Sequence, residues 1–170
     1  MMRAGGLVAH ATATVPGVAA SPWQPAGVKR LLRFKQRPGP FLVLADAPRT
    51  AMRLAPFFTP GLRRLMHESW PGRTTLVFRA RPGLPACCYQ RGWLAVRVDA
   101  SPFVRELARR CGGLILSSSL NRRGQATRAL DRRWRWRWHR HLAALLPGEA
   151  GEGTPSAIWR VRGRRTERLR

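Results

Sequence analysis

Two short groups of polar residues carry the chemistry that this sequence most readily suggests. Lys35 and Arg37 stand two residues apart, so a mobile ammonium and a planar guanidinium can converge on one multivalent anion. Ser119 and Asn121 can donate hydrogen bonds to phosphate or carboxylate oxygens, and Ser117 can add a further hydroxyl. Each group alone is also compatible with solvated surface charge or a serine-rich turn. Together they predict one anion-binding active site.

The hydrophobic pattern predicts the elements that position these groups. Apolar residues recur at helical spacing over 28–35, and Pro38-Gly39-Pro40 stops that helix just after Lys35. Residues 114–116 form a buried apolar run that leads into the serines. The polar groups therefore lie at the carboxyl end of a strand, where open α/β sheets bind ligands.

Strand and helix patterns alternate along most of the remaining chain, which predicts an α/β fold. The strand at 94–98 alternates so that Arg97 projects opposite the apolar set. The Arg/Trp-rich stretch 132–138 fits a helix, although it could also alternate as a strand. Further strands are predicted at 7–9, 41–44 and 75–78, and helices at 46–58, 59–66, 101–111 and 127–145, with Asp46, Thr59 and Ser101 as N-caps.

The end of the chain differs from the rest in composition. Residues 147–156 are rich in Gly, Pro and Glu, and 160–170 are mostly basic with little means of burying a core. The expected division is one domain at 1–146, followed by a linker and basic tail at 147–170.

Length and charge restrict the class of protein. A chain of 170 residues with 44% hydrophobic content suffices for one core. The excess of 32 Lys and Arg over 8 Asp and Glu gives a net charge of +24, which favours a polyanionic partner, although a GC-rich genome would also favour arginine. No apolar run reaches the roughly 18 residues of a membrane span, so no membrane association is predicted and a soluble, cytoplasmic protein is expected.

The first residues, the cysteines and most of the histidines do not indicate a functional site. The first 21 residues match a signal peptide poorly, because polar residues interrupt the apolar stretch. Cys87, Cys88 and Cys111 lack the spacing of a zinc site or a disulfide framework. The last three of the four histidines have no acidic partner pattern, which favours surface positions: His67, His139 and His141.

Five segments, taken in order, resemble the YrdC/TsaC family of threonylcarbamoyl-AMP synthases. The family's hallmark is a KxR motif paired with a later SxN motif, here Lys35 and Arg37 with Ser119 and Asn121. The resemblance implies a YrdC-like single domain, in which a twisted mixed sheet flanked by helices carries a deep, positively charged cleft. The segments are VKRLLRFKQRP at 28–38, SWPGRTTLVF at 69–78, LAVRV at 94–98, LSSSLNRRG at 116–124 and LLPGEAGEGTPSAI at 145–158.

The resemblance also implies an activity and roles for particular residues. The family joins L-threonine, bicarbonate and ATP, the last with Mg²⁺, into threonylcarbamoyl-AMP and pyrophosphate, and passes the product to partner transferase proteins that modify tRNA. The implied catalytic residues are Lys35, Arg37, Ser119 and Asn121. The implied nucleotide contacts add Thr75, Arg97 and Ser117, the implied substrate contacts add His10 and Thr12, and no metal ligand is implied.

The chain departs from the family pattern mainly in its first loop. Ala13 stands where the family has a glutamate, and Pro16 replaces an aromatic residue. Arg73 and Arg123 replace a proline and a serine of the later motifs. The segment before Leu7 is short, which predicts that the family's first helix is missing and that the domain is truncated at its N-terminus.

Two alternative functions stay open at this point. A catalytically weakened relative could bind double-stranded RNA or tRNA through its basic surface, with residues 132–138 stacking on bases, although these residues could equally form a helix that buries Trp134 and Trp138. A membrane-active Arg/Trp-rich protein is the weakest alternative, because it leaves the α/β pattern unexplained.

Overall fold

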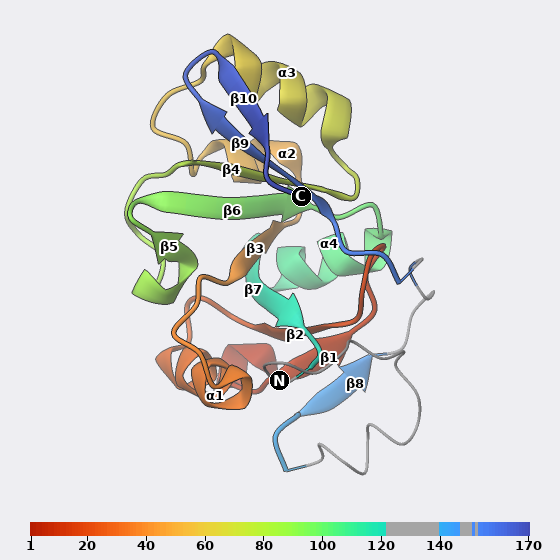
Figure 1. Cartoon of the computed structure of the whole chain (residues 1–170). Coiled ribbons are helices and arrows are strands. Elements are labelled where there is room, and N and C mark those ends of the chain that lie inside the picture. Colours follow the sequence, from red (N-terminus) through yellow and green to blue (C-terminus); the bar gives the residue numbers. More distant parts are fainter. Residues whose placement is uncertain (122–139, 147–150, 152) are drawn as a thin grey trace.

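The computed structural model describes residues 1–121, 140–146, 151 and 153–170. A twisted sheet runs through these residues, with the strand order β10-β9-β4-β6-β3-β7-β2-β1-β8 and β5 paired to β6 (Figure 1). The strands are β1 (Val8–His10), β2 (Gly17–Ala20), β3 (Leu42–Ala45), β4 (Thr74–Arg79), β5 (Tyr89–Gln90), β6 (Trp93–Val98), β7 (Leu114–Ser119), β8 (Ala144–Leu146), β9 (Ala157–Arg162) and β10 (Arg165–Arg168). The helices are α1 (Pro25–Lys35), α2 (Pro48–Met52), α3 (Pro60–Ser69) and α4 (Pro102–Arg110), with 3₁₀ turns at Met2–Ala4 and Ala86–Cys88.

The sheet is mixed, as expected. Strands β3 and β6, β4 and β9, and β1 and β8 pair in parallel, while the other neighbouring strands pair antiparallel. The mixed α/β architecture with flanking helices is thereby confirmed.

Alternation along the strands divides the core into two layers. Val43 and Ala45 pack with the apolar faces of α1, α2 and α3, whereas Leu44, between them, packs with Val104 and Ala108 of α4. The same alternation recurs in β7, where Ile115 faces α4. Helix α4 covers only part of its face of the sheet, so the polar side chains of the neighbouring strands on that face remain available for a site.

Local signals explain where two of the helices begin and end. Thr59 caps α3, because its hydroxyl accepts a hydrogen bond from the Leu62 N–H at 3.2 Å, and Pro60 follows in the first turn. Helix α1 ends at Gln36, a left-handed residue with φ 51° whose N–H bonds to Leu32 and Arg33 carbonyls.

Two helix predictions need correction. The helix expected over 46–58 is the short α2, capped at Ala47 rather than Asp46, and it ends at Met52. Pro56 explains the early end, since it lacks an N–H and disfavours helical geometry at the preceding residue. In α4 the Ser101 side chain makes no cap, and Phe103, expected in the core, is 42% exposed.

The C-terminal part of the described chain also differs from expectation. The end of the helix predicted over 127–145 is wrong, because residues 144–146 form β8 beside β1. The predicted basic tail is wrong for 157–168, because β9 adds in parallel to β4 and β10 forms a hairpin with β9. Adding β9 to the sheet satisfies backbone groups of β4 and buries Val161. Residues 132–138, the Arg/Trp-rich stretch, lie outside the described residues, as do Arg123 and His139.

None of the described helices is both long enough and apolar enough to cross a membrane.

Candidate active site

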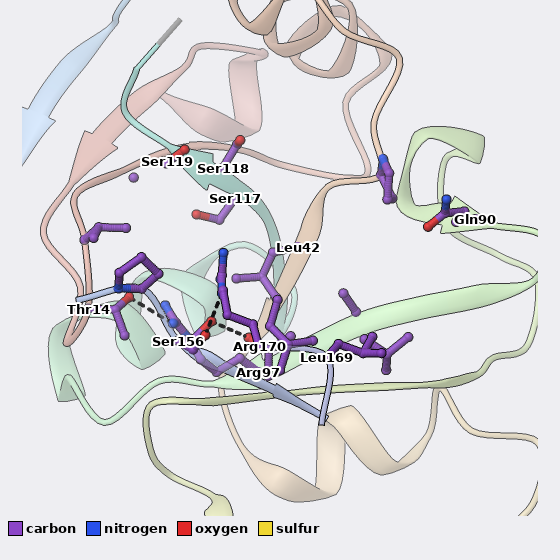
Figure 2. Close-up of a pocket in the computed structure, with 18 of the residues that line it drawn as sticks. Thr14, Leu42, Gln90, Arg97, Ser117, Ser118, Ser119, Ser156, Leu169 and Arg170 are labelled. Carbon is purple, nitrogen blue, oxygen red and sulfur yellow. Dashed lines mark hydrogen bonds between the residues drawn. The ribbon is translucent and has the colours of Figure 1, made fainter. Parts of the chain in front are cut away.

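A cavity of about 700 Å³ opens on the face of the sheet that α4 leaves uncovered (Figure 2). Its described lining contains no acidic side chain, and hydroxyls come from β4, from β7 and from the loops that precede β2 and β9. The hydroxyl residues are Thr12, Thr14, Thr75, Ser117, Ser118, Ser119 and Ser156. The basic residues of the lining are Arg37, Arg91, Arg97, Arg160 and Arg170.

Strand alternation places several predicted residues on this cavity. Leu94, Val96 and Val98 of β6 are fully buried in the layer of α1–α3, so Arg97 between them points the other way, into the lining. Thr75 reaches the cavity from β4 by the same rule, and its hydroxyl lies 3.0 Å from that of Ser156. Arg97 is therefore not a surface residue, since it is only 3% exposed.

The structure joins Lys35 to Ser119 and Asn121. The Lys35 ammonium donates to the Ser119 carbonyl at 2.7 Å and to the Asn121 side-chain oxygen at 3.0 Å, and it also donates to the Asn121 carbonyl. The Ser119 hydroxyl donates to the same Asn121 side-chain oxygen at 2.6 Å. Ser119 lines the cavity, so Lys35 and Asn121 are attached to its wall.

Burial and charge alter the acidity of the two cations. Burial, with a smaller contribution from the charge of Arg37, lowers the pKa of Lys35 to about 8. The Arg37 guanidinium donates to the Ser118 hydroxyl at 3.2 Å and lies over the Phe41 ring, 5.0 Å from its centroid. Burial also lowers the pKa of Arg37. The two cations thus contact neighbouring residues at the end of β7, Lys35 at Ser119 and Arg37 at Ser118.

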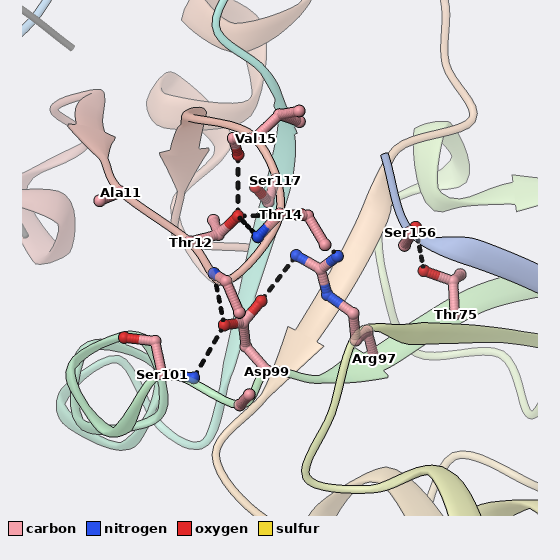
Figure 3. Close-up of polar contacts among 12 residues, drawn as sticks. Ala11, Thr12, Thr14, Val15, Thr75, Arg97, Asp99, Ser101, Ser117 and Ser156 are labelled. Atoms are coloured by element: carbon pink, nitrogen blue, oxygen red, sulfur yellow. Dashed lines mark hydrogen bonds and ion pairs between the residues drawn. The ribbon is translucent and has the colours of Figure 1, made fainter. Parts of the chain in front are cut away.

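A buried network connects the first loop to β6 (Figure 3). Arg97 forms an ion pair with Asp99 at 2.7 Å and donates to the Thr14 hydroxyl at 2.9 Å. The Thr14 hydroxyl lies 3.0 Å from that of Thr12. Burial lowers the pKa of Arg97, and the Asp99 carboxylate opposes that shift.

His10 has a different environment from the one predicted. Its ring is fully buried, Nδ1 donates to the Ala11 carbonyl at 3.0 Å, and Nε2 lies 3.4 Å from the Ser117 hydroxyl. Burial lowers the pKa of His10 to about 4, so the ring is neutral near pH 7. It supports Ser117 from behind and is not part of the described cavity lining.

Several residues of the site were not predicted from the sequence. Thr14 and Asp99 each stand two residues from a predicted residue, a spacing that places side chains on one face of an extended segment and could have identified them. Ser156 and Arg170 gave no such signal, because their segment was expected to be a linker and tail. The Arg170 guanidinium donates to the Ser156 carbonyl at 3.2 Å, which brings the last residue to the cavity.

The described residues hold no group of three or more His, Cys, Asp or Glu side chains suited to a metal ion. Cys87, Cys88 and Cys111 are free thiols, and burial raises the pKa of each.

Comparison with known proteins gives consistent matches over the whole chain. The family model Sua5_yciO_yrdC, described as "Telomere recombination", matches residues 1–170. A threonylcarbamoyl-AMP synthase of Stenotrophomonas maltophilia is 36% identical over 155 residues, covering 88% of this chain and 83% of the relative. One of Nitrosococcus oceani is 33% identical over 175 residues, covering 100% of this chain and 93% of the relative.

Solved structures show the same fold. E. coli YciO superposes with a TM-score of 0.86 at 20% identity, covering 99% of this chain and 84% of that one. P. abyssi Sua5 complexed with L-threonine superposes with a TM-score of 0.89 at 24% identity, covering 99% of this chain. This chain spans about half of that Sua5, since it covers 51% of its length.

Proposed function

The chain belongs to the Sua5–YciO–YrdC family, and from this premise we propose that it is a threonylcarbamoyl-AMP synthase that makes threonylcarbamoyl-AMP and pyrophosphate from L-threonine, bicarbonate and ATP. The relatives that bear this name match nearly the full chain at more than 30% identity. The observation that carries the proposal is the joining of Lys35 to Ser119 and Asn121 at the wall of an arginine-lined cavity.

The reaction brings several negative charges together, and the site supplies positive ones. The threonine amine and bicarbonate form a carbamate with loss of water. A carbamate oxygen then attacks the α-phosphorus of ATP, and the bond to the pyrophosphate leaving group breaks. In the proposed arrangement, Arg37 binds the phosphates as charge moves onto pyrophosphate, and Lys35, whose three N–H groups are donated to Ser119 and Asn121, adds its positive charge from behind the cavity wall. Fixed cations in a partly dry site act without reorganisation. Ser119 and Asn121 hold Lys35 in place, so catalysis is mostly orientation and electrostatics.

The remaining cavity residues are assigned by their positions. Thr75, Ser117 and Ser119 are the proposed nucleotide contacts, and Thr12 is the proposed contact to L-threonine. Arg97 was also expected at the nucleotide, but its guanidinium is bound to Asp99 and Thr14, so we assign it to the first loop. His10 acts through Ser117, whose hydroxyl its ring contacts.

Mg²⁺ is proposed to enter as the complex with ATP. The described lining has no acidic side chain, the kind of side chain that Mg²⁺ ordinarily binds, so these residues do not fit a resident magnesium ion. Hydroxyls and backbone carbonyls would contact the ion only through its water shell.

The product's use defines the proposed partners. An adenylate carrying a threonylcarbamoyl group is consumed by a transferase that acts on tRNA, and a cytoplasmic location follows because tRNA and ATP are found there. A second candidate function, binding of double-stranded RNA or tRNA without turnover, is favoured by the net charge of +24 together with the loss of a loop carboxylate at Ala13.

The test is a direct assay of the purified protein with L-threonine, bicarbonate and Mg-ATP. Pyrophosphate release that depends on L-threonine and formation of threonylcarbamoyl-AMP are expected. Lys35→Ala and Asn121→Ala should each lower kcat/KM by at least about a hundredfold, a typical loss when a charge-stabilising group is removed. Lys29→Ala is the matched control, since Lys29 is exposed on the same helix. Folded wild-type protein that forms no product would refute the proposed function and leave the RNA-binding alternative.

A further inference from the structure

Asp99 is a fully buried carboxylate that connects three segments. One carboxylate oxygen, Oδ1, accepts hydrogen bonds from the Ala13 N–H at 3.1 Å and the Ser101 N–H at 3.0 Å. The other, Oδ2, pairs with the Arg97 guanidinium at 2.7 Å. Asp99 therefore ties the end of β6 to the first loop and to the start of α4 (Figure 3).

The charge around Asp99 is otherwise positive. Arg97 is 3% exposed, and the charges of Arg73 and Arg170 act on it in addition to that of Asp99. Leaving a buried guanidinium without its counter-ion is strongly unfavourable, so Asp99 is needed wherever Arg97 stays buried. The first loop has no carboxylate side chain of its own. Ala13 stands at the position where the YrdC/TsaC pattern has a glutamate.

The hydrogen bonds that Arg97 makes set the direction of the loop hydroxyls. The Thr12 hydroxyl donates its single hydrogen to the Val15 carbonyl at 2.8 Å. The hydrogen between the two threonines must then come from Thr14, whose oxygen also accepts from Arg97 at 2.9 Å. One lone pair is left on the Thr14 oxygen, and Thr14 lines the cavity. The loop thus presents an acceptor to a bound molecule.

We propose that Asp99 is a positioning residue of the active site, which holds Arg97 and the Ala13 amide together so that Thr14 presents a hydrogen-bond acceptor to the amine or hydroxyl of the substrate. The assignment of that substrate as L-threonine rests on the proposed function. In this arrangement β6 supplies the carboxylate that the first loop lacks, and Asp99 itself touches no substrate.

The test compares Asp99→Asn and Asp99→Ala with the control Asp46→Asn. Asparagine keeps an oxygen for the two backbone amides but loses the charge opposite Arg97, whereas alanine loses both. Asp46 is an aspartate at the end of β3, outside the described lining, so its change should leave the kinetics unaltered.

The expected result is a change confined to one substrate. Both Asp99 variants should raise the KM for L-threonine by at least about tenfold, the usual effect of disturbing a buried hydrogen bond to a charged group, while the KM for ATP changes by less than about threefold. In Asp99→Ala the Ala13 amide should also exchange its hydrogen faster than in wild type. If Asp99→Ala fails to fold, the Asp99→Asn kinetics decide.

Two results would overturn this inference. Equal changes in both KM values, or a lower melting temperature with unchanged kinetics below it, would show that Asp99 only stabilises the fold. Unchanged exchange at Ala13 in a folded Asp99→Ala protein would show that the loop does not depend on this carboxylate, whether or not the wild type is active. If instead the proposed function is wrong, the wild-type protein itself makes no product, and this result distinguishes that failure from a failure of the inference about Asp99.

Discussion

Lys35 differs in its surroundings from the other lysine of the chain. Lys29 and Lys35 are the only lysines, and both belong to α1, but Lys29 is exposed whereas Lys35 is 3% exposed. Three oxygen atoms of Ser119 and Asn121 surround the Lys35 ammonium. Burial lowers its pKa to about 8, so its charge changes within an accessible pH range.

We predict that ATP binding weakens as pH rises through about 8, the pKa of Lys35 in the free protein. Protonated Lys35 attracts phosphate, and bound ATP in turn raises the pKa of Lys35, so the dissociation constant rises once the pH exceeds the free value. Calorimetric titration of ATP between about pH 6.5 and 9.5 measures this dependence. Lys29→Ala should retain the profile, and a flat profile in the wild type would contradict the role given to Lys35.

The burial of His10 predicts that the free energy of unfolding decreases at acidic pH. Its pKa is lowered from 6.5 to about 4 by burial, so protons bind the unfolded chain more readily. The stability that neutral His10 provides is fully present above pH 6.5. As the pH falls toward 4, the free energy of unfolding decreases by up to about 3 kcal/mol. Urea unfolding of wild type and His10→Asn over this range should show the wild type losing the larger share of its stability.

The control for that measurement is His67→Asn, because His67 is exposed on α3. It should lose stability in step with the wild type. A parallel loss in wild type and His10→Asn would mean that protonation of His10 does not drive acid unfolding.

The sequence predicted those residues of the candidate site that can be identified from the spacing of nearby residues. The residue pairs Lys35 with Arg37 and Ser119 with Asn121 follow from short motifs, and Arg97 follows from the period of a strand. Arg170 could not be found in this way, since it reaches the cavity through the β9–β10 hairpin and a hydrogen bond to Ser156. Contacts between distant segments leave no local pattern.

At the scale of elements, prediction succeeded where an apolar period and a capping signal agree, and failed where one of them was absent. Helix α3 has both, with Thr59 as cap and Leu62 and Met66 buried. Helix α2 is shorter than its apolar period suggests because Pro56 interrupts it. Four of the six residues of strand β9 are apolar, but arginines alternate with them towards its end, and its pairing depends on the edge of β4, which no local pattern in residues 157–162 reveals.

The connection between α1 and β3 depends on close backbone packing. Gly39 has φ 116°, and a Cβ there would lie 2.4 Å from the Cys87 carbonyl oxygen, which also accepts a hydrogen bond from the Phe41 N–H at 2.9 Å. This contact fixes the turn that follows Arg37. A side chain at Gly39 would therefore displace the turn and the guanidinium together.

We predict that Gly39→Ala lowers the free energy of unfolding by about 2 to 4 kcal/mol, because strain in φ adds to an overpacked contact. Gly83→Ala is a matched control, since Gly83 also has a positive φ, 134°, but nothing lies near its Cβ position. The free energy of unfolding of the Gly83→Ala variant should fall by only about 1 kcal/mol. Urea unfolding measures both values, and equal losses would show that the approach to Cys87 is not what requires glycine.

The whole molecule combines one continuous sheet with a large excess of positive charge. The first loop, β7 and the C-terminal hairpin are far apart in sequence, and the sheet order places all three around one cavity. Five arginines line it, yet they account for only part of the net charge of +24. Many of the other described arginines are exposed, so they can act on large anions that do not enter the cavity.

We predict that the protein binds double-stranded RNA or tRNA with a steep dependence on salt. Each phosphate contact releases counterions, so the dissociation constant should rise at least about a hundredfold between roughly 50 and 200 mM salt. Fluorescence anisotropy with a labelled duplex, repeated in the presence of L-threonine and ATP, measures this dependence. In the proposed arrangement the cavity holds the small substrates and the outer surface holds RNA, so saturating substrates should leave the RNA affinity nearly unchanged. Competition between ATP and RNA would instead place the nucleic acid in the cavity itself, and binding that is insensitive to salt would contradict an electrostatic interaction.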